Sequence, residues 1–140
     1  MGKPPDGTPM SRSRPVVLHP DEGVAGPATP GMEMRHLFDR DGRWAGWAGW
    51  IRNDAGDASG WHHHAANDTY VYIIRGSLTL DFGPGGAESV VARAGDFIFI
   101  PSQTIHHETT GQDGDVEAFV FRVGGEPEHV NVDGPEPAGG

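Results

Sequence analysis

The sequence predicts an all-β protein, a barrel or sandwich of about ten short antiparallel strands. Its 140 residues include 22 glycines and 12 prolines, and hydrophobic residues make up 36% of them. This composition is typical of many short strands joined by turns. The chain also lacks an internal repeat and a heptad pattern. At this length we expect one domain with a moderate core.

Ten segments fit strands by alternation or by short apolar runs: 16–18, 32–38, 43–51, 61–65, 69–74, 78–82, 89–93, 97–100, 106–109 and 116–123. The segment 32–38 alternates apolar and polar positions, as a half-buried strand does. In 43–51 three tryptophans recur at three-residue spacing, which could suit a helix. Gly46 and Gly49 make a helix poor there, so a strand with aromatic side chains on both faces is the better interpretation.

Turn residues separate the later segments. Gly76 and the run 83–86 (Gly-Pro-Gly-Gly) suit tight connections, and Gly95 with Asp96 makes another. The two ends are rich in Pro, Gly and polar residues. We therefore expect a flexible arm over 1–14, which could cross a neighbouring subunit, a β-domain over 15–125 and a tail over 126–140.

Charge and composition exclude several classes of protein. The formal net charge of −10 repels phosphate backbones, so nucleic acid is not an expected partner. No apolar run is long enough to span a membrane, and the first twenty residues lack the apolar core of a secretory signal. The chain has no cysteine, which excludes disulfides and thiol catalysis and fits the cytoplasm, where we expect the protein.

A histidine cluster points to a metal. His62 and His64 are two residues apart in a predicted strand, so their side chains project to the same side. His106 follows a separate predicted strand. Two imidazoles from one strand and a third from a distant strand are what a mononuclear site in a β-barrel needs. Neutral imidazole suits iron, nickel, copper and zinc.

These residues also carry a resemblance. The stretch 60–76 resembles the first motif of the cupin superfamily, and 95–110 resembles the second, Gly-x5-Pro-x-Gly-x2-His-x3-Asn. Gly95, Pro101 and His106 fall in register with that second motif, which selects His106 over His107. The resemblance covers about 100 residues. It implies a double-stranded β-helix, the cupin jelly-roll barrel, with a metal in the barrel mouth.

The chain departs from the family pattern at three positions. Thr69 occupies the slot where many cupins place a glutamate ligand, Gln103 replaces a glycine and Thr110 replaces the asparagine. The resemblance then implies a first shell of three neutral histidines, His62, His64 and His106, with waters. Such a site leaves the ion at its full charge and favours an anionic substrate.

Other residues have competing interpretations. His63 and His107 lie one residue out of phase and should point away, while Asp68 could ligate if a bulge shifts the register. His36 is the first choice for a fourth ligand or a general acid/base, although a core histidine is commoner. Thr69 is expected beside the metal and is assigned a catalytic role together with His36.

The remaining candidates concern the pocket. We expect most of the aromatic residues to belong to the core and about a third of them to face substrate, giving an aromatic mouth for a planar or apolar ligand: Trp44, Trp50, Phe97, Phe99, Phe119 and Phe121. Arg75 and Arg122 could clamp a carboxylate, although exposed arginines at strand ends are commoner.

The first functional hypothesis is a non-haem iron oxygenase, a dioxygenase-like oxidoreductase that acts on a small organic molecule. The expected cofactor is one divalent ion per subunit, Fe²⁺ first, with Zn²⁺, Ni²⁺ or Mn²⁺ as alternatives. The second hypothesis is a zinc- or nickel-dependent cyclase, isomerase or dehydratase, and the third is a non-catalytic binding barrel. Small cupins commonly pair, so a homodimer is expected.

Overall fold

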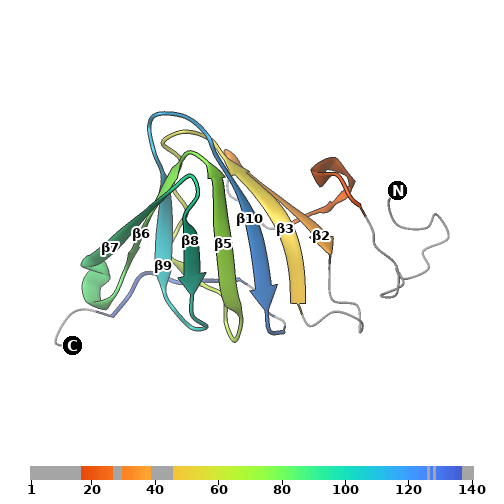
Figure 1. Ribbon diagram of the computed structural model, residues 1–140. Coiled ribbons are helices and arrows are strands. Elements are labelled where there is room, and N and C mark those ends of the chain that lie inside the picture. The colour runs from red at the N-terminus through yellow and green to blue at the C-terminus, as the bar shows by residue number, and fades with distance from the viewer. Residues whose placement is uncertain (1–16, 27–29, 39–45, 126, 128, 137–140) are drawn as a thin grey trace.

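The computed structural model describes residues 17–26, 30–38, 46–125, 127 and 129–136. These residues form two antiparallel β-sheets that face each other and splay apart toward one end (Figure 1). The only helical turns among them are two 3₁₀ turns, η1 (Pro20–Glu22) and η2 (Pro84–Gly86). Within the described ranges, no helix has the length and apolar character needed to cross a membrane.

The six-stranded sheet has the order β1-β2-β3-β10-β5-β8. Its strands are β1 (Val24–Ala25), β2 (Met32–Phe38), β3 (Gly46–Asn53), β10 (Val116–Val123), β5 (Asp68–Arg75) and β8 (Phe97–Ile100). The five-stranded sheet has the order β11-β4-β9-β6-β7. Its strands are β11 (Val130–Asn131), β4 (His62–His63), β9 (His106–Thr110), β6 (Ser77–Phe82) and β7 (Glu88–Arg93).

This arrangement confirms the predicted all-β double-stranded β-helix, with one refinement. From β3 onward, consecutive strands alternate between the sheets except at the β6–β7 hairpin, and this wraps the chain into a jelly roll. Either a closed barrel or a sandwich would have satisfied the sequence pattern. The two sheets are separate and open, so the sandwich is the form that occurs.

Most predicted strands occur within a few residues of their expected bounds. The tryptophan segment is a strand: Trp47 faces inward and is buried, while Trp50 is half-buried on the other side. The segment 16–18 is not borne out where it can be followed, because residues 17 and 18 lie outside any strand. The two-residue strands β1 and β11 were not predicted, since they are too short to show alternation.

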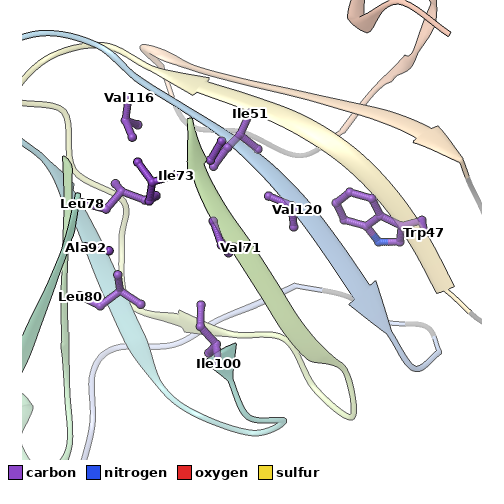
Figure 2. Close-up of a cluster of buried hydrophobic side chains, with 11 residues drawn as sticks. Trp47, Ile51, Val71, Ile73, Leu78, Leu80, Ala92, Ile100, Val116 and Val120 are labelled. Carbon is purple, nitrogen blue, oxygen red and sulfur yellow. The ribbon is translucent and has the colours of Figure 1, made fainter. Parts of the chain in front are cut away.

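The core lies between the sheets (Figure 2). Eleven buried hydrophobic residues form one cluster: Trp47, Ile51, Val71, Ile73, Leu78, Leu80, Ala92, Ile100, Val116, Ala118 and Val120. Each sheet presents every second residue inward, so the two inner faces interdigitate and exclude water. At the end near the β5–β6 turn Ile73, Leu78 and Val116 are almost fully buried. That end is closed.

Two turns show why the chain bends where it does. Gly76 has a positive φ of 80°, and a Cβ there would collide with the backbone of Asp115, so only glycine fits. Gln103, at the slot of a family glycine, also has a positive φ, of 66°, which side chains rarely adopt. Its backbone N–H donates to the Ala65 carbonyl over 2.8 Å. That bond ties the loop before β9 to the segment after β4.

Part of the predicted tail, 126–140, pairs with the β-domain. β11 pairs with β4, and Val132 donates its N–H to the Trp61 carbonyl at 3.1 Å. The C-terminal segment therefore adds an edge strand beside the histidine cluster. The predicted N-terminal arm, 1–14, lies outside the described residues.

Candidate metal centre

Three buried histidines and one glutamate converge on the inner side of the five-stranded sheet, beside β4 and β9. One ligand atom from each of His62, His64, His106 and Glu108 lies within 4.8 Å of the other three. The sheet register explains the convergence, because His62 on β4 stands directly opposite His106 on β9. The structure thus brings together the three histidines that the sequence predicted. It also adds a carboxylate.

Glu108 was not among the predicted ligands. Its Oε1 lies 3.5 Å from Nε2 of His106 and 3.9 Å from Nε2 of His62. The signal was present in the sequence, since residues two apart on a strand share a face. His106 and Glu108 have the same spacing on β9 as His62 and His64 around β4. The resemblance did not point to it, because the family's usual glutamate slot lies in the first motif and holds Thr69.

Backbone carbonyls orient two of the imidazoles. Nδ1 of His62 lies 2.8 Å from the Gly60 oxygen, and Nδ1 of His106 lies 2.8 Å from the Thr104 oxygen. A carbonyl oxygen only accepts, so each neutral ring carries its proton on Nδ1 and turns the Nε2 lone pair toward the cluster. Hydrogen bonds of this kind fix metal-binding histidines in many proteins.

The protonation states also suit a cation. Burial lowers the pKa of His62 to about 4, although the carboxylate of Glu108 opposes the shift. Burial alone would raise the pKa of Glu108, but the neighbouring imidazoles, that of His106 first, lower it to about 2. At neutral pH His62 is therefore neutral and Glu108 ionised, and these are the forms that bind metals.

The loop after β4 holds His64 in place. Asn67 is fully buried, and both its backbone N–H and its side-chain amide donate to the His64 carbonyl at 3.0 Å. The same amide reaches Gly125 beyond β10, over 2.8 Å. One side chain thus joins the ligand loop to the six-stranded sheet.

The out-of-phase histidines lie outside the cluster, where the alternation predicts them. Nδ1 of His63 accepts the N–H of Ala65 at 2.9 Å. His107 lies on the opposite side of β9, with Nε2 3.3 Å from Asp81 and its ring edge-on to Trp61.

A cavity of about 200 Å³ adjoins the cluster and lies between the sheets. Its walls are mainly aliphatic and include Met32, Met34, Ile51, Val71, Leu78, Leu80, Ile98, Ile100 and Val120. Of the part of the chain that the structure describes, no phenylalanine, tyrosine or tryptophan lines it. The expected aromatic mouth is therefore wrong. Phe97, Phe99, Phe119 and Phe121 are exposed on the outer surface, and Trp44 lies outside the described residues.

One basic side chain reaches into this apolar wall. Arg122 is only 6% exposed, lines the cavity and lies over the Trp47 ring, with its Cζ 5.0 Å from the ring centroid. Its Nε donates to the hydroxyl of Thr69 at 2.9 Å, and both residues are buried. Thr69 therefore lines the cavity and orients Arg122. Arg75, by contrast, is exposed and lies 3.8 Å from Glu117.

Two further candidates lie away from the four-residue cluster. His36 stacks on the buried Trp47 with ring centroids 3.9 Å apart, which is the core position that the sequence gave as the commoner alternative. The Asp68 carboxylate accepts the N–H of Ser102 at 3.0 Å. A catalytic role for His36 stays a prediction.

His129 is a residue that the sequence analysis did not single out. It comes from the C-terminal segment just before β11, lines the cavity and stacks on the His62 ring with centroids 4.5 Å apart. Its Nε2 lies 2.9 Å from the amide oxygen of Asn131. No periodicity marks it, because the pairing of β11 with β4 brings it there.

Comparison with known proteins agrees with this fold. The sequence model of one family, described as "Cupin domain", matches residues 49–122, more than half of the chain. That range contains all four residues of the cluster and both sheets' central strands. No curated protein matches the sequence.

Several solved structures are similar in fold. The polyketide cyclase RemF from Streptomyces resistomycificus is 20% identical with a TM-score of 0.68, over 85% of this chain and 86% of that one. An uncharacterized double-stranded β-helix protein from Klebsiella pneumoniae is 14% identical with a TM-score of 0.66, over 88% and 98%. A predicted oxalate decarboxylase from Thermotoga maritima is 20% identical with a TM-score of 0.61, over 77% and 98%. At these identities the likeness shows the fold alone.

Proposed function

This chain belongs to the cupin domain family, and on that premise we propose that it is a metal-dependent enzyme acting on a small organic molecule. The ligands of its single divalent ion are His62, His64, His106 and Glu108. The observation that carries the proposal is their convergence within 4.8 Å, since a set of imidazoles with one carboxylate suits first-row metals.

The cavity defines the class of substrate. Its volume of about 200 Å³ and its aliphatic walls suit a small, largely apolar molecule. The buried guanidinium of Arg122 adds a positive charge to that wall. We therefore expect a substrate with an anionic oxygen, such as a carboxylate, enolate or phenolate. Thr69 keeps the guanidinium in place through its hydroxyl.

We rank a non-redox reaction first: a cyclisation, isomerisation or elimination on a carbonyl compound. When bound, the ion would act as a Lewis acid on a substrate oxygen. The reason for this ranking is Glu108. The oxygenase hypothesis was motivated by a set of only neutral ligands, and the carboxylate in the cluster removes that motivation. The similar protein described as a polyketide cyclase adds support from analogy.

An iron-dependent dioxygenase remains the second candidate. The observation that favours it is the aliphatic wall beside three histidines, because an apolar cavity accommodates O2 and keeps water away. It requires Fe²⁺, whereas the non-redox reaction would also proceed with Zn²⁺ or Ni²⁺.

Metal titration tests the shared part of the proposal. Chelator-treated protein is titrated calorimetrically with Zn²⁺ and Ni²⁺, and with Fe²⁺ under nitrogen. We expect one ion per chain, lost in His62→Ala and kept in His63→Ala. Failure to bind any of the three ions at one equivalent would refute both reactions.

Activity separates the two candidates. Each metal form is incubated with a panel of β-diketones and hydroxylated aromatic acids, once in air and once under nitrogen. Product formed under nitrogen by the zinc or nickel form supports the non-redox reaction. If only the iron form is active and it consumes oxygen, the dioxygenase is supported and the non-redox reaction is rejected. Metal-dependent ligand binding without turnover across the panel would instead indicate a binding protein.

A further inference from the structure

The C-terminal segment brings polar side chains to the cavity that the proposed function does not use. Residues 129–136, which we call the strap, come just before the C-terminal end of the chain (Figure 1). Their strand β11 lies at the edge of the five-stranded sheet, next to β4. His129 and Asn131 of the strap both line the cavity. The strap is therefore part of the wall around the histidine cluster.

Backbone hydrogen bonds fix the position of the strap. β11 pairs with β4 over two residues. The N–H of Val132 donates to the Trp61 carbonyl at 3.1 Å. At the end of the strap the carbonyl of Glu136 accepts the N–H of Gly85 at 2.7 Å. Since these bonds involve only backbone groups, a side-chain substitution at the start of the strap should leave it in place.

His129 lies beside the cluster but is not placed to bind the ion. Its ring stacks on that of His62, with centroids 4.5 Å apart and planes only 11° from parallel. The lone pair with which imidazole binds a metal lies in the plane of the ring. Nearly parallel planes at this separation meet only far from both rings, so a single ion cannot lie in both. Among the described residues, the group whose ligand atoms converge within 4.8 Å accordingly does not include His129.

Asn131 sets the hydrogen-bonding character of the His129 ring. Its amide oxygen lies 2.9 Å from Nε2 of His129. Because an amide oxygen only accepts, the neutral ring carries its proton on Nε2 and keeps the lone pair of Nδ1. Within the described part of the chain, Asn131 is the one hydrogen-bond partner of this ring. The strap thus presents a hydrogen-bond acceptor of fixed orientation at the edge of the cavity.

We propose that His129 binds the substrate, with Nδ1 accepting a hydrogen bond from a hydroxyl group of that molecule. The inference rests on the function proposed above and narrows its class of substrate. Arg122 is buried on the six-stranded sheet, whereas His129 is exposed on the strap beside the five-stranded sheet, and both line the cavity. A matching substrate carries an anionic oxygen and a hydroxyl group on one small apolar body. A hydroxylated carboxylic acid is of this kind.

The alternative is that His129 only shields His62 from water through the ring stack. Phenylalanine would do this equally well, because it has a ring of similar size without nitrogen atoms. A stack alone also has no need of the bond that orients His129. The substitution His129→Phe therefore separates the two roles, since it keeps a stacked ring and removes the acceptor.

Calorimetric binding of small acids to the zinc-loaded full chain tests the inference. The probes are benzoate and its meta- and para-hydroxy derivatives, which differ from benzoate only by the hydroxyl. We expect wild type to bind one hydroxylated isomer at least about tenfold more tightly than benzoate, because a site with an unpaired acceptor discriminates against a ligand without the donor. His129→Phe should bind that isomer no more tightly than benzoate. His129→Leu, which removes the ring as well, should lose the preference too.

The matched control is His63→Phe. His63 lies on β4, opposite Val130 of the strap, but its Nδ1 accepts the N–H of Ala65 outside the cluster. This variant should keep the full preference for the hydroxylated isomer. Zinc affinity, measured by chelator competition, should change less than about threefold in all three variants, because none of the substituted residues is a ligand.

The outcomes separate this inference from the proposed function. Wild type that holds zinc but binds no probe at about 10 mM would remove the proposed class of substrate, and the inference with it. Equal binding of all three probes by wild type would overturn the inference alone. So would a preference that survives in His129→Phe, since another group would then recognise the hydroxyl. A fall in zinc affinity of more than about tenfold in His129→Phe would show that His129 acts on the ion instead.

Discussion

The two sheets serve the same cavity in different ways. The five-stranded sheet contributes the ligand cluster from short elements, the two-residue β4 with the loop after it and the five-residue β9. The six-stranded sheet contributes most of the aliphatic wall, from long strands that include β3, β5 and β10, each of eight residues, while Leu78 and Leu80 of β6 complete it. In the proposed function, ion binding would therefore belong to the five-stranded sheet and substrate selection mainly to the six-stranded one. Substitutions in one sheet should leave the function of the other largely intact.

The largest effect is expected where the five-stranded sheet holds the ion. Removing the His106 imidazole in His106→Ala should weaken zinc binding more than about 100-fold, because one of four ligands is lost. Competition with a chromogenic chelator measures the affinity. Arg122→Met, on the other sheet, is the control and should change zinc affinity less than threefold. A larger change of zinc affinity in Arg122→Met would contradict the idea that the two sheets have separate functions.

Acid should destabilise the five-stranded sheet at the histidine cluster, because the two cluster residues with shifted pKa values are His62 and Glu108. The folded protein lowers the pKa of His62 to about 4 from an ordinary value of 6.5, so its stabilising contribution is full above pH 6.5 and is lost as the pH falls toward 4. Between pH 7 and pH 5 the metal-free protein should lose about 2 kcal/mol of unfolding free energy from this residue. Glu108, with its pKa lowered to about 2, contributes to acid lability only below about pH 4.5.

Urea unfolding of the metal-free protein at the two pH values measures the loss. His62→Asn removes the titrating ring and should flatten the dependence. An equal loss in wild type and variant would show that another group controls it.

Substitutions in the cavity wall on the six-stranded sheet should change the free energy of unfolding rather than the metal affinity. Thr69→Val removes the oxygen that accepts from Nε of the buried Arg122, which should cost about 1.5 kcal/mol of unfolding free energy. Thr79→Val, on the outer face of the other sheet, is the matched control and should be nearly neutral. Thr69 stands in the family's glutamate slot, so zinc affinity is the decisive second measurement. If it falls tenfold, Thr69 acts on the ion rather than on Arg122.

The smallest effect concerns the loop that joins the sheets between β8 and β9. Gln103→Gly relieves the positive φ at that position, and after the entropic cost of glycine we expect a gain of about 0.5 kcal/mol. Gln112→Gly, at an exposed site without a positive φ, should instead destabilise. Thermal unfolding distinguishes the two. A loss of stability in Gln103→Gly would mean that its side chain contributes more than its backbone strain costs.

The sequence predicted the strands well because alternation is a local property. β2 coincides with its predicted bounds, and most of the later strands differ by one or two residues. The same local rule placed His62 and His64 on one side and His63 on the other. Alternation also places Glu108 on the same side as His106, because it comes two residues later on β9. Glu108 was not predicted, because the family's usual glutamate slot lies at Thr69 and not on the strand of His106.

Alternation cannot say which face of a strand meets the core and which meets solvent or a partner when both faces are apolar. The strands β5, β8 and β10 are apolar on both sides, so their aromatic residues were assigned to core and mouth, whereas the sheet turns Phe97, Phe99, Phe119 and Phe121 outward. Alternation likewise does not predict that Arg122 is buried. A charge near a strand end is normally exposed, whereas here the hydroxyl of Thr69 accepts a hydrogen bond from Arg122 and the guanidinium lies over the Trp47 ring, which helps to offset the cost of burial.

By itself, then, the sequence determined the all-β class, the strand positions and the phase of the histidines, since each follows from residues two positions apart. The tertiary structure alone decided the contacts between distant segments. It placed His62 opposite His106, added Glu108 to them and brought His129 over the ring of His62. These contacts depend on which strands pair and in what register. That choice is made by the free energy of the whole packed sandwich and not by any one segment.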